Sequence, residues 1–214
     1  NHFKQLYEKG LPIVFFDRVT SEINTHKVCA DNFKGAYDAT EHLINNGFKR
    51  IGHITSAPYL SISMERLEGY KEALRKNNIE YDEKLVQHCY NGGMIYDEVE
   101  DALKKIFKLK QKPDALFTAG DRITTTCMQA LQKLGKKIPD DIAIIGFTNT
   151  TIGELFNPSL SVVRQPAFEI GQVATELLIS MIESKRPVTE FENKVLQTEM
   201  VIRESSAKNI TPKK

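Results

Sequence analysis

The sequence predicts an α/β protein in which parallel sheets are flanked by helices. One observation behind this is the apolar run 142–147, whose β-branched residues are typical of a strand buried on both faces. The other is that predicted strands and helices alternate at least five times along the chain. Such alternation favours parallel strands joined by right-handed crossovers that cover both faces of a sheet. We therefore expect strand 142–147 to lie at the centre of its sheet.

Helices are expected where apolar residues recur with the period of a helix between a start signal and a stop signal. Asp31 or Asn32 can cap one such helix, and Gly47 and Gly135 can each end one in the left-handed conformation. The predicted helices lie within 1–10, 32–47, 63–77, 99–107, 121–135 and 170–182.

Strands are expected in the short apolar runs between these helices, each bounded by polar or turn-forming residues. The final predicted strand alternates apolar and polar residues, and the last residues, ending TPKK, have nothing apolar to dock and are expected to fray. The predicted strands lie at 12–16, 50–55, 85–90, 115–119, 142–147, 160–163 and 195–203.

Composition favours an ordinary soluble protein with a sizeable core. The chain has 214 residues, of which 41% are hydrophobic and 27% charged, and a formal net charge of +1. This balance gives no basic footprint for nucleic acid, and no apolar run is long enough to span a membrane. Three scattered cysteines indicate reduced, buried thiols in a cytoplasmic protein rather than a disulfide framework.

No motif for catalysis, for a metal or for a cofactor is found. The sequence lacks a phosphate-binding loop, a zinc-binding H-E-x-x-H helix and a G-x-S-x-G nucleophile elbow. The histidines are scattered, and His42 and His53 fall on a predicted helix and strand as structural residues would. We predict no enzyme activity, no catalytic residues, no metal and no cofactor.

Polar side chains gather where predicted strands end and helices begin. For any one of them a turn or a helix cap is an equally good interpretation, but ligands of open parallel sheets bind outside the carboxyl ends of the strands. As a set these residues predict a site for a small polyhydroxylated molecule: Asp17, Ser56, Asp121, Thr148, Asn149 and Gln165.

Several stretches carry a family resemblance through their order and spacing. They are LPIVFFDR, DNFKGAYDATEHLINNGFKRIGHI, RLEGYKEAL, KPDALFTAGD, IPDDIAIIGFTNTTIGELFNPSLSVVRQP and LQTEMVIRES. Between Leu11 and Ser205 the chain resembles the effector-binding core of the LacI/GalR family of bacterial transcription regulators. This resemblance implies two lobes of the type I periplasmic-binding-protein kind, joined by three crossovers around a hinged cleft.

The resemblance places residues 1–57 and 167–190 in an N-terminal lobe, 58–166 and 191–206 in a C-terminal lobe, and 207–214 in a disordered tail. Only two predicted strands then belong to the first lobe before the second crossover, which makes that lobe incomplete. Members of the family carry two further β-α units and a helix-turn-helix headpiece ahead of Pro12. We therefore expect this chain to be an N-terminally truncated fragment.

The resemblance also implies ligand-binding residues. Arg66, in the motif R-x-x-G-Y, matches the arginine that contacts the effector, although a surface arginine is the alternative. Asp17 and Gln165 match positions that line the cleft, and Phe16 could stack on a ring or belong to the core. Gly120 and Thr148 stand where sugar-responsive members often have Asn and Asp. This departure favours a ligand that needs fewer polar partners, or an anionic one.

The leading functional hypothesis is the effector-sensing domain of a dimeric, cytoplasmic transcription regulator. A sugar, a sugar phosphate or a nucleobase would bind the cleft and change the geometry of paired headpieces on operator DNA. Without a headpiece the fragment itself is not expected to bind operator DNA. Two alternatives stay open: a periplasmic-type solute receptor for a transporter, and an interaction module whose cleft is empty.

Overall fold

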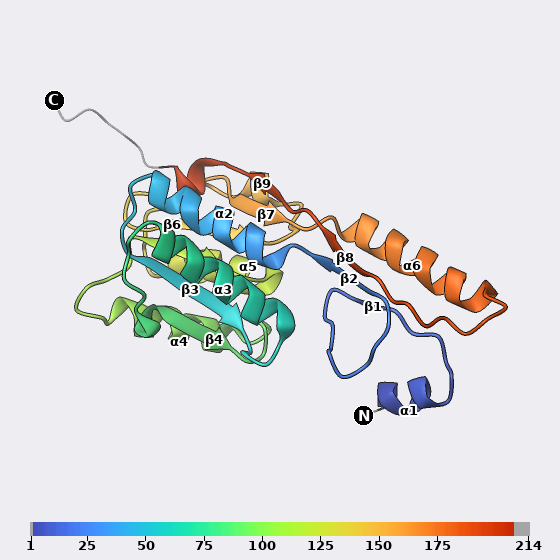
Figure 1. Ribbon diagram of the computed structural model, residues 1–214. Helices are drawn as coiled ribbons and strands as arrows, with labels where there is room; N and C mark the ends of the chain where they lie inside the picture. Colours follow the sequence, from blue (N-terminus) through green and yellow to red (C-terminus); the bar gives the residue numbers. More distant parts are fainter. Residues whose placement is uncertain (1, 208–214) are drawn as a thin grey trace. The chain divides into compact units, whose positions relative to one another are not determined.

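A computed structural model describes residues 2–207 as two compact units. The first unit holds the residues up to Asp31 together with Gln165–Thr198. The second holds Asn32–Arg164 together with the residues from Glu199 onward. Each unit is built around its own sheet, and the ribbon in Figure 1 follows the chain through both.

The first unit is a three-stranded parallel sheet with one long helix. Its strands lie in the order β1-β2-β8, and Val28 and Ala30 of the central strand pack against Ile170 and Ala174. Its elements are α1 (His2–Glu8), β1 (Phe15–Phe16), β2 (Lys27–Ala30), α6 (Ala167–Glu183) and β8 (Asn193–Leu196).

The second unit is a six-stranded sheet in the order β4-β3-β5-β6-β7-β9, parallel except for the last pair. Its strands are β3 (Ile51–Ser56), β4 (Val86–Cys89), β5 (Ala115–Thr118), β6 (Ala143–Phe147), β7 (Ser161–Arg164) and β9 (Glu199–Val201). Its α-helices are α2 (Asn32–Asn45), α3 (Ser61–Lys76), α4 (Tyr96–Phe107) and α5 (Asp121–Lys133), and its 3-10 helices are η1 (Glu83–Leu85), η2 (Gly153–Leu155) and η3 (Glu204–Ser206).

Alternation along the strands explains why this sheet is covered on both faces. Successive side chains of a strand point to opposite faces, so Ile144 joins the core under α4 and α5 while Ile145 joins the core under α2 and α3. All of β6 is buried, as predicted for 142–147, and β6 pairs with β5 on one side and β7 on the other. The prediction of a central, doubly covered strand is confirmed.

Two strands differ from the prediction. The structure has β2 at Lys27–Ala30, which was not predicted because Val28 is the only large apolar residue in it. The predicted strand 195–203 is two strands, β8 and β9, which pair in different sheets. Of the two strands expected for the first unit, 12–16 corresponds to β1, whereas 50–55 corresponds to β3 of the other sheet.

The unit boundaries differ as well. The chain passes between units after Asp31, after Arg164 and after Thr198, whereas the crossovers were expected near residues 57, 166 and 190. The first boundary moves because β3 hydrogen-bonds between β4 and β5 and so belongs to the second sheet. Of the predicted tail 207–214, residues 208–214 lie outside the described residues, and the amide of Ala207 donates to the Glu204 carbonyl at 3.1 Å.

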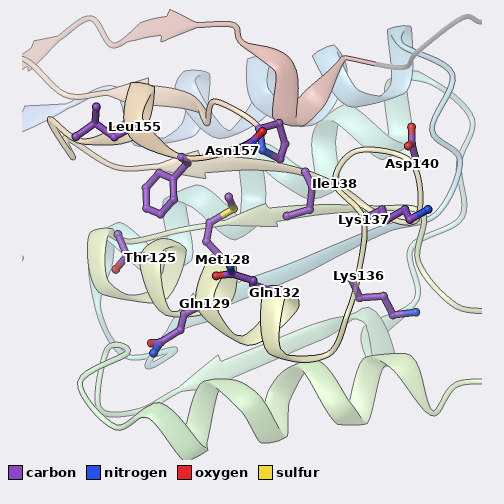
Figure 2. A pocket seen from close by; sticks show the side chains of 12 residues that line it. Thr125, Met128, Gln129, Gln132, Lys136, Lys137, Ile138, Asp140, Leu155 and Asn157 are labelled. Carbon is purple, nitrogen blue, oxygen red and sulfur yellow. The ribbon is translucent and has the colours of Figure 1, made fainter.

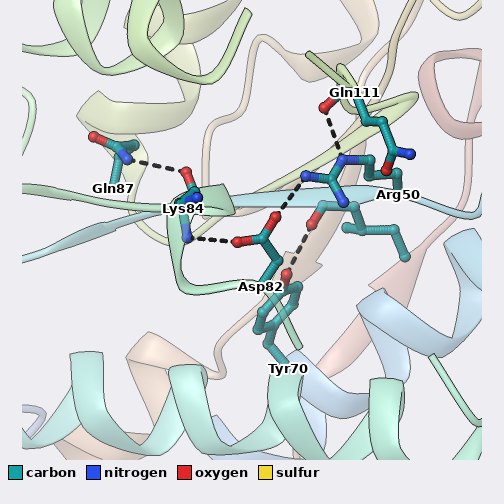
Figure 3. A network of polar contacts seen from close by, with 7 residues as sticks. Arg50, Tyr70, Asp82, Lys84, Gln87 and Gln111 are labelled. Atoms are coloured by element: carbon teal, nitrogen blue, oxygen red, sulfur yellow. Dashed lines mark hydrogen bonds and ion pairs between the residues drawn. The ribbon is translucent and has the colours of Figure 1, made fainter. Parts of the chain in front are cut away.

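The amino-terminal edge of the second sheet is held by a polar network, shown in Figure 3. Arg50 donates through Nη2 to Asp82 at 2.6 Å and through Nε to the Gln111 carbonyl at 2.8 Å. Tyr70 donates its hydroxyl to the Ile51 carbonyl at 2.7 Å. These contacts use the polar groups at this edge for structure, so a ligand site is better sought at the opposite, carboxyl edge.

His53 makes the stability of the second unit depend on pH. Its ring is fully buried, stacked between Tyr70 and Phe117 at centroid distances of 5.0 and 4.9 Å. Burial lowers the pKa of His53 to about 3, against about 6.5 in an unfolded chain. Below about pH 6.5 the unfolded state therefore binds a proton that the folded state does not, so the free energy of unfolding falls as the pH falls.

We expect the free energy of unfolding to drop by about 2 kcal/mol between pH 7 and pH 5 through His53. Urea unfolding at both pH values measures this. In His53→Gln most of the drop should disappear, with a residual slope from His42, whose pKa burial also lowers. An unchanged pH dependence in His53→Gln would contradict the assignment.

Candidate functional site

The carboxyl ends of β3, β5 and β6 bring several predicted site residues to one edge of the second sheet. Ser56 ends β3, Asp121 begins α5 just after β5, and Thr148 and Asn149 follow β6 directly. Because β3, β5 and β6 are parallel neighbours, their carboxyl ends share one edge. Arg66, from the second turn of α3, reaches the same edge through the contacts described next.

Arg66 is buried, with 3% of its surface exposed, so the interpretation as a surface arginine is wrong. Its Nε donates to Asn32 Oδ1 at 2.9 Å, and its Nη1 donates to the Ala119 carbonyl, just past β5, at 3.4 Å. The guanidinium carbon lies 3.7 Å from the centroid of the Phe147 ring at the end of β6. The side chain is thus fixed across the ends of two central strands.

The burial of Arg66 carries a cost in free energy that its contacts must offset. Removing a guanidinium from water is unfavourable unless hydrogen bonds compensate, and structural cores rarely accept it. A desolvated cation over an aromatic face contributes roughly 2 kcal/mol. The planar guanidinium, oriented in this way, suits paired oxygen atoms of a ligand.

Gly69 allows α3, which carries Arg66, to pack closely against α2. A Cβ atom at Gly69 would lie 2.2 Å from the Phe33 carbonyl oxygen and 3.0 Å from the Ala36 Cβ. Only a glycine lets the start of α2 approach α3 this closely, and this approach puts Asn32 within hydrogen-bonding distance of Arg66. The motif R-x-x-G-Y therefore has a packing reason as well as a chemical one.

Asn32 is a partner of this arginine, and Glu65 is a partner of Asn32; neither residue was predicted for the site from the sequence. Asn32 Nδ2 donates to Glu65 Oε2 at 2.8 Å while Asn32 Oδ1 accepts from Arg66. From the sequence, Asn32 is predicted only as a possible helix cap. The contact of Asn32 with Arg66 could not be predicted from the sequence, because it depends on the distance between α2 and α3.

Asp121 joins two of the predicted site residues in one cluster. Its Oδ1 accepts from Thr148 Oγ1 at 2.5 Å and from the Asn149 amide at 2.7 Å. Its position in the first turn of α5 is favourable for a carboxylate because of the helix dipole. Asp121 therefore fixes the loop after β6 relative to α5, which is a structural role beside any contact with a ligand.

Ser56 lies half-buried at the end of β3, next to a glycine loop. Its carbonyl accepts from His88 Nδ1 at 2.9 Å, and a Cβ built on Gly92 would lie 3.9 Å from Ser56 Oγ. Gly92 has a positive φ of 60°, so the loop turns tightly beside Ser56. The Ser56 hydroxyl is thereby placed at the same edge as Arg66.

Three predicted site residues belong to the first unit. Phe16 is 56% exposed at the end of β1, so the alternative of a core residue is wrong. Asp17 has a positive φ of 58°, and its amide donates to the Val28 carbonyl at 3.0 Å. The Gln165 carbonyl accepts from Ala167 at the start of α6. Their part in ligand binding stays a prediction.

A cavity of about 750 Å³ lies elsewhere on the second unit, along α5 and the segment after η2. Figure 2 shows Met128, Gln129, Gln132 and Leu155 around it. No residue predicted for the site lines this cavity. The volume of this cavity is not enough to choose it as the ligand site, because the buried and oriented Arg66 lies at the strand ends instead.

Among residues 2–207, no group of three or more His, Cys, Asp or Glu is placed to hold a metal ion. Within the same residues no helix has both the length and the hydropathy that crossing a bilayer requires. Burial raises the pKa of the Cys89 thiol to about 12 and also raises the pKa of Cys127. These two thiols are therefore poor nucleophiles.

Comparison with known proteins gives a family for this chain. The model of the family described as "Periplasmic binding protein-like domain" matches residues 40–206. The ribose operon repressor of Halalkalibacterium halodurans is 30% identical over 204 residues, which cover 95% of this chain and 59% of that protein. The chain thus spans about three fifths of the length of the curated relatives it matches.

Two solved structures resemble the fold. A transcriptional regulator CelR in complex with cellobiose has a TM-score of 0.83 and 32% identity, covering 94% of this chain and 61% of that one. A LacI family regulator from Enterococcus faecium with bound ribose has a TM-score of 0.84 and 27% identity, covering 95% and 74%. The chain therefore belongs to the periplasmic binding protein-like domain family, among the LacI/GalR transcription regulators.

Proposed function

We propose that this chain is the effector-sensing core of a LacI/GalR-type transcription regulator and that it binds a sugar or a sugar derivative. The observation that carries the proposal is Arg66, buried and fixed across the ends of β5 and β6. A polyhydroxylated ligand needs several oriented donors and acceptors, and Ser56, Thr148 and Asn149 lie at the same strand ends. Phe16, Asp17 and Gln165 are proposed as further contacts.

Two lines of support come from the relatives. By their titles, one relative is a ribose operon repressor, and two similar solved structures hold cellobiose or ribose. One is described as a helix-turn-helix type regulator, which supports a DNA-binding headpiece in the whole protein. Binding would then control operator occupancy through a difference in affinity between two arrangements of the core.

The proposal includes a partner and a compartment. A two-fold operator is read by two headpieces, so the whole regulator is proposed to act as a homodimer on DNA in the cytoplasm. No catalytic role is proposed, since the named relatives are transcription regulators.

A thermal-unfolding screen tests the ligand class. Ribose, cellobiose, their phosphate esters and free nucleobases are each added at increasing concentration. A ligand at about 100 times its dissociation constant adds roughly 2.7 kcal/mol to the free energy of unfolding. We expect a saturable rise in Tm with a sugar or a sugar phosphate. A Tm that no compound of these classes raises would favour an interaction module and overturn the proposal.

A further inference from the structure

The residue at which the chain enters the second unit is hydrogen-bonded to the proposed ligand-binding arginine. The amide of Asp31, the last residue of the first segment, donates to the Leu196 carbonyl of β8 at 2.8 Å. The next residue, Asn32, begins α2 and accepts from Arg66 Nε at 2.9 Å. A single peptide bond thus separates a contact of the first sheet from a contact of Arg66.

Asn32 is suited to hold Arg66 because its amide has both an acceptor and a donor. The acceptor binds the cationic Arg66, and the donor binds the carboxylate of Glu65 at 2.8 Å. Only 2% of Asn32 is exposed, so a lost partner would be left unsatisfied in the interior. A movement of the guanidinium must therefore move the amide or break a buried hydrogen bond.

Asn32 is the first residue of α2, where an asparagine can also serve the start of the helix. Its side chain is directed to α3, where it contacts two successive residues, Glu65 and Arg66. The close approach that Gly69 permits puts it there. These two contacts hold the Asn32 side chain against α3.

We propose that Asn32 is a positioning residue, which orients the Arg66 guanidinium over Phe147 and transmits its displacement on ligand binding to the connection between Asp31 and Asn32. The inference rests on the proposed function, in which Arg66 binds the sugar. Ligand binding at the strand ends of the second unit would then bias the conformation of this connection, and a change in the connection would bias the affinity for the ligand.

The test compares four proteins by ribose titration and by hydrogen–deuterium exchange. They are the wild type, Asn32→Ala, the double variant Asn32→Asp with Glu65→Gln, and Asn45→Ala. The double variant keeps the acceptor for Arg66 and exchanges donor and acceptor with residue 65, without a change of net charge. Asn45 is an exposed asparagine at the other end of α2 and is the matched control. Cellobiose replaces ribose if only cellobiose raises Tm.

In the wild type, sugar is expected to slow the exchange of the amides of residues 31–33 at least fivefold. Asn32→Ala should bind the sugar about tenfold more weakly and, at saturating sugar, lose the protection at 31–33 while keeping protection at 119–121. The double variant and Asn45→Ala should behave as the wild type does. The protection at 119–121 separates a broken connection from a protein that no longer folds or binds.

Protection at 31–33 that survives in Asn32→Ala, or that is absent from the wild type, would overturn the inference. Unaltered sugar binding in Arg66→Ala is a different failure, because it would remove the proposed function itself. A double variant that behaves as Asn32→Ala does would also count against the positioning role.

Discussion

Gly69→Ala is expected to lower the free energy of unfolding by about 3 kcal/mol or more. The added methyl group would lie 2.2 Å from the Phe33 carbonyl oxygen, and that atom belongs to the backbone of α2, so no side chain can rotate away to make room. The two helices would have to separate, which opens the core that they cover. Thermal unfolding should show a Tm about 10 °C below that of the wild type.

Gly171→Ala is the matched control for this change. Gly171 also lies inside a helix, α6, but a Cβ atom there would meet nothing within 4 Å. Because alanine is the better helix former, Gly171→Ala should raise the stability by up to about 1 kcal/mol. If Gly69→Ala were as stable as Gly171→Ala, the close packing of α2 and α3 would not be required.

Arg66→Ala is expected to weaken sugar binding by about 100-fold or more, which removes the rise in Tm at ligand concentrations that saturate the wild type. Two charge-assisted hydrogen bonds to a desolvated guanidinium account for a loss of this size. Arg66→Lys keeps the charge but loses the planar guanidinium, so it should recover little of the affinity. Calorimetric titration with the sugar that raises Tm most measures all three proteins.

Arg122→Ala is the control for Arg66→Ala. Arg122 is an exposed arginine in the first turn of α5, next to Asp121. The loss of one surface charge there should change the sugar affinity by less than about threefold. Equal losses in the two variants would point to a general electrostatic effect instead of a specific contact.

The sequence predicted the parts of the fold that depend on local periodicity. The doubly covered strand β6 and the helices α2 to α6 were predicted because apolar runs and helical stripes report burial directly. The strand β2 was not predicted, since its pairing with β8 joins residues more than 160 positions apart in a stretch with few apolar residues. The first boundary between the units was expected near residue 57 but lies after Asp31. Its position depends on which sheet β3 joins, and that pairing is also between residues far apart in the sequence.

The candidate site was predicted in part. Strand ends and a family motif were enough to select Arg66, Asp121 and Thr148, but not to show that Arg66 is buried. Asn32 and Phe147 were missed as partners because their contacts with Arg66 depend on how closely α2 approaches α3 and on where β6 ends. Distances of this kind arise from packing between elements, which periodicity does not report.

The most direct test of the central claim is to map the bound sugar onto the backbone by amide chemical-shift changes in the ¹⁵N-labelled protein. We expect saturable changes concentrated at the carboxyl ends of the second sheet, at Ser56, Ala119, Asp121 and Thr148, and small changes at its amino edge around Arg50. Changes concentrated around the cavity at Met128 and Leu155, with none at the strand ends, would show that the site lies elsewhere.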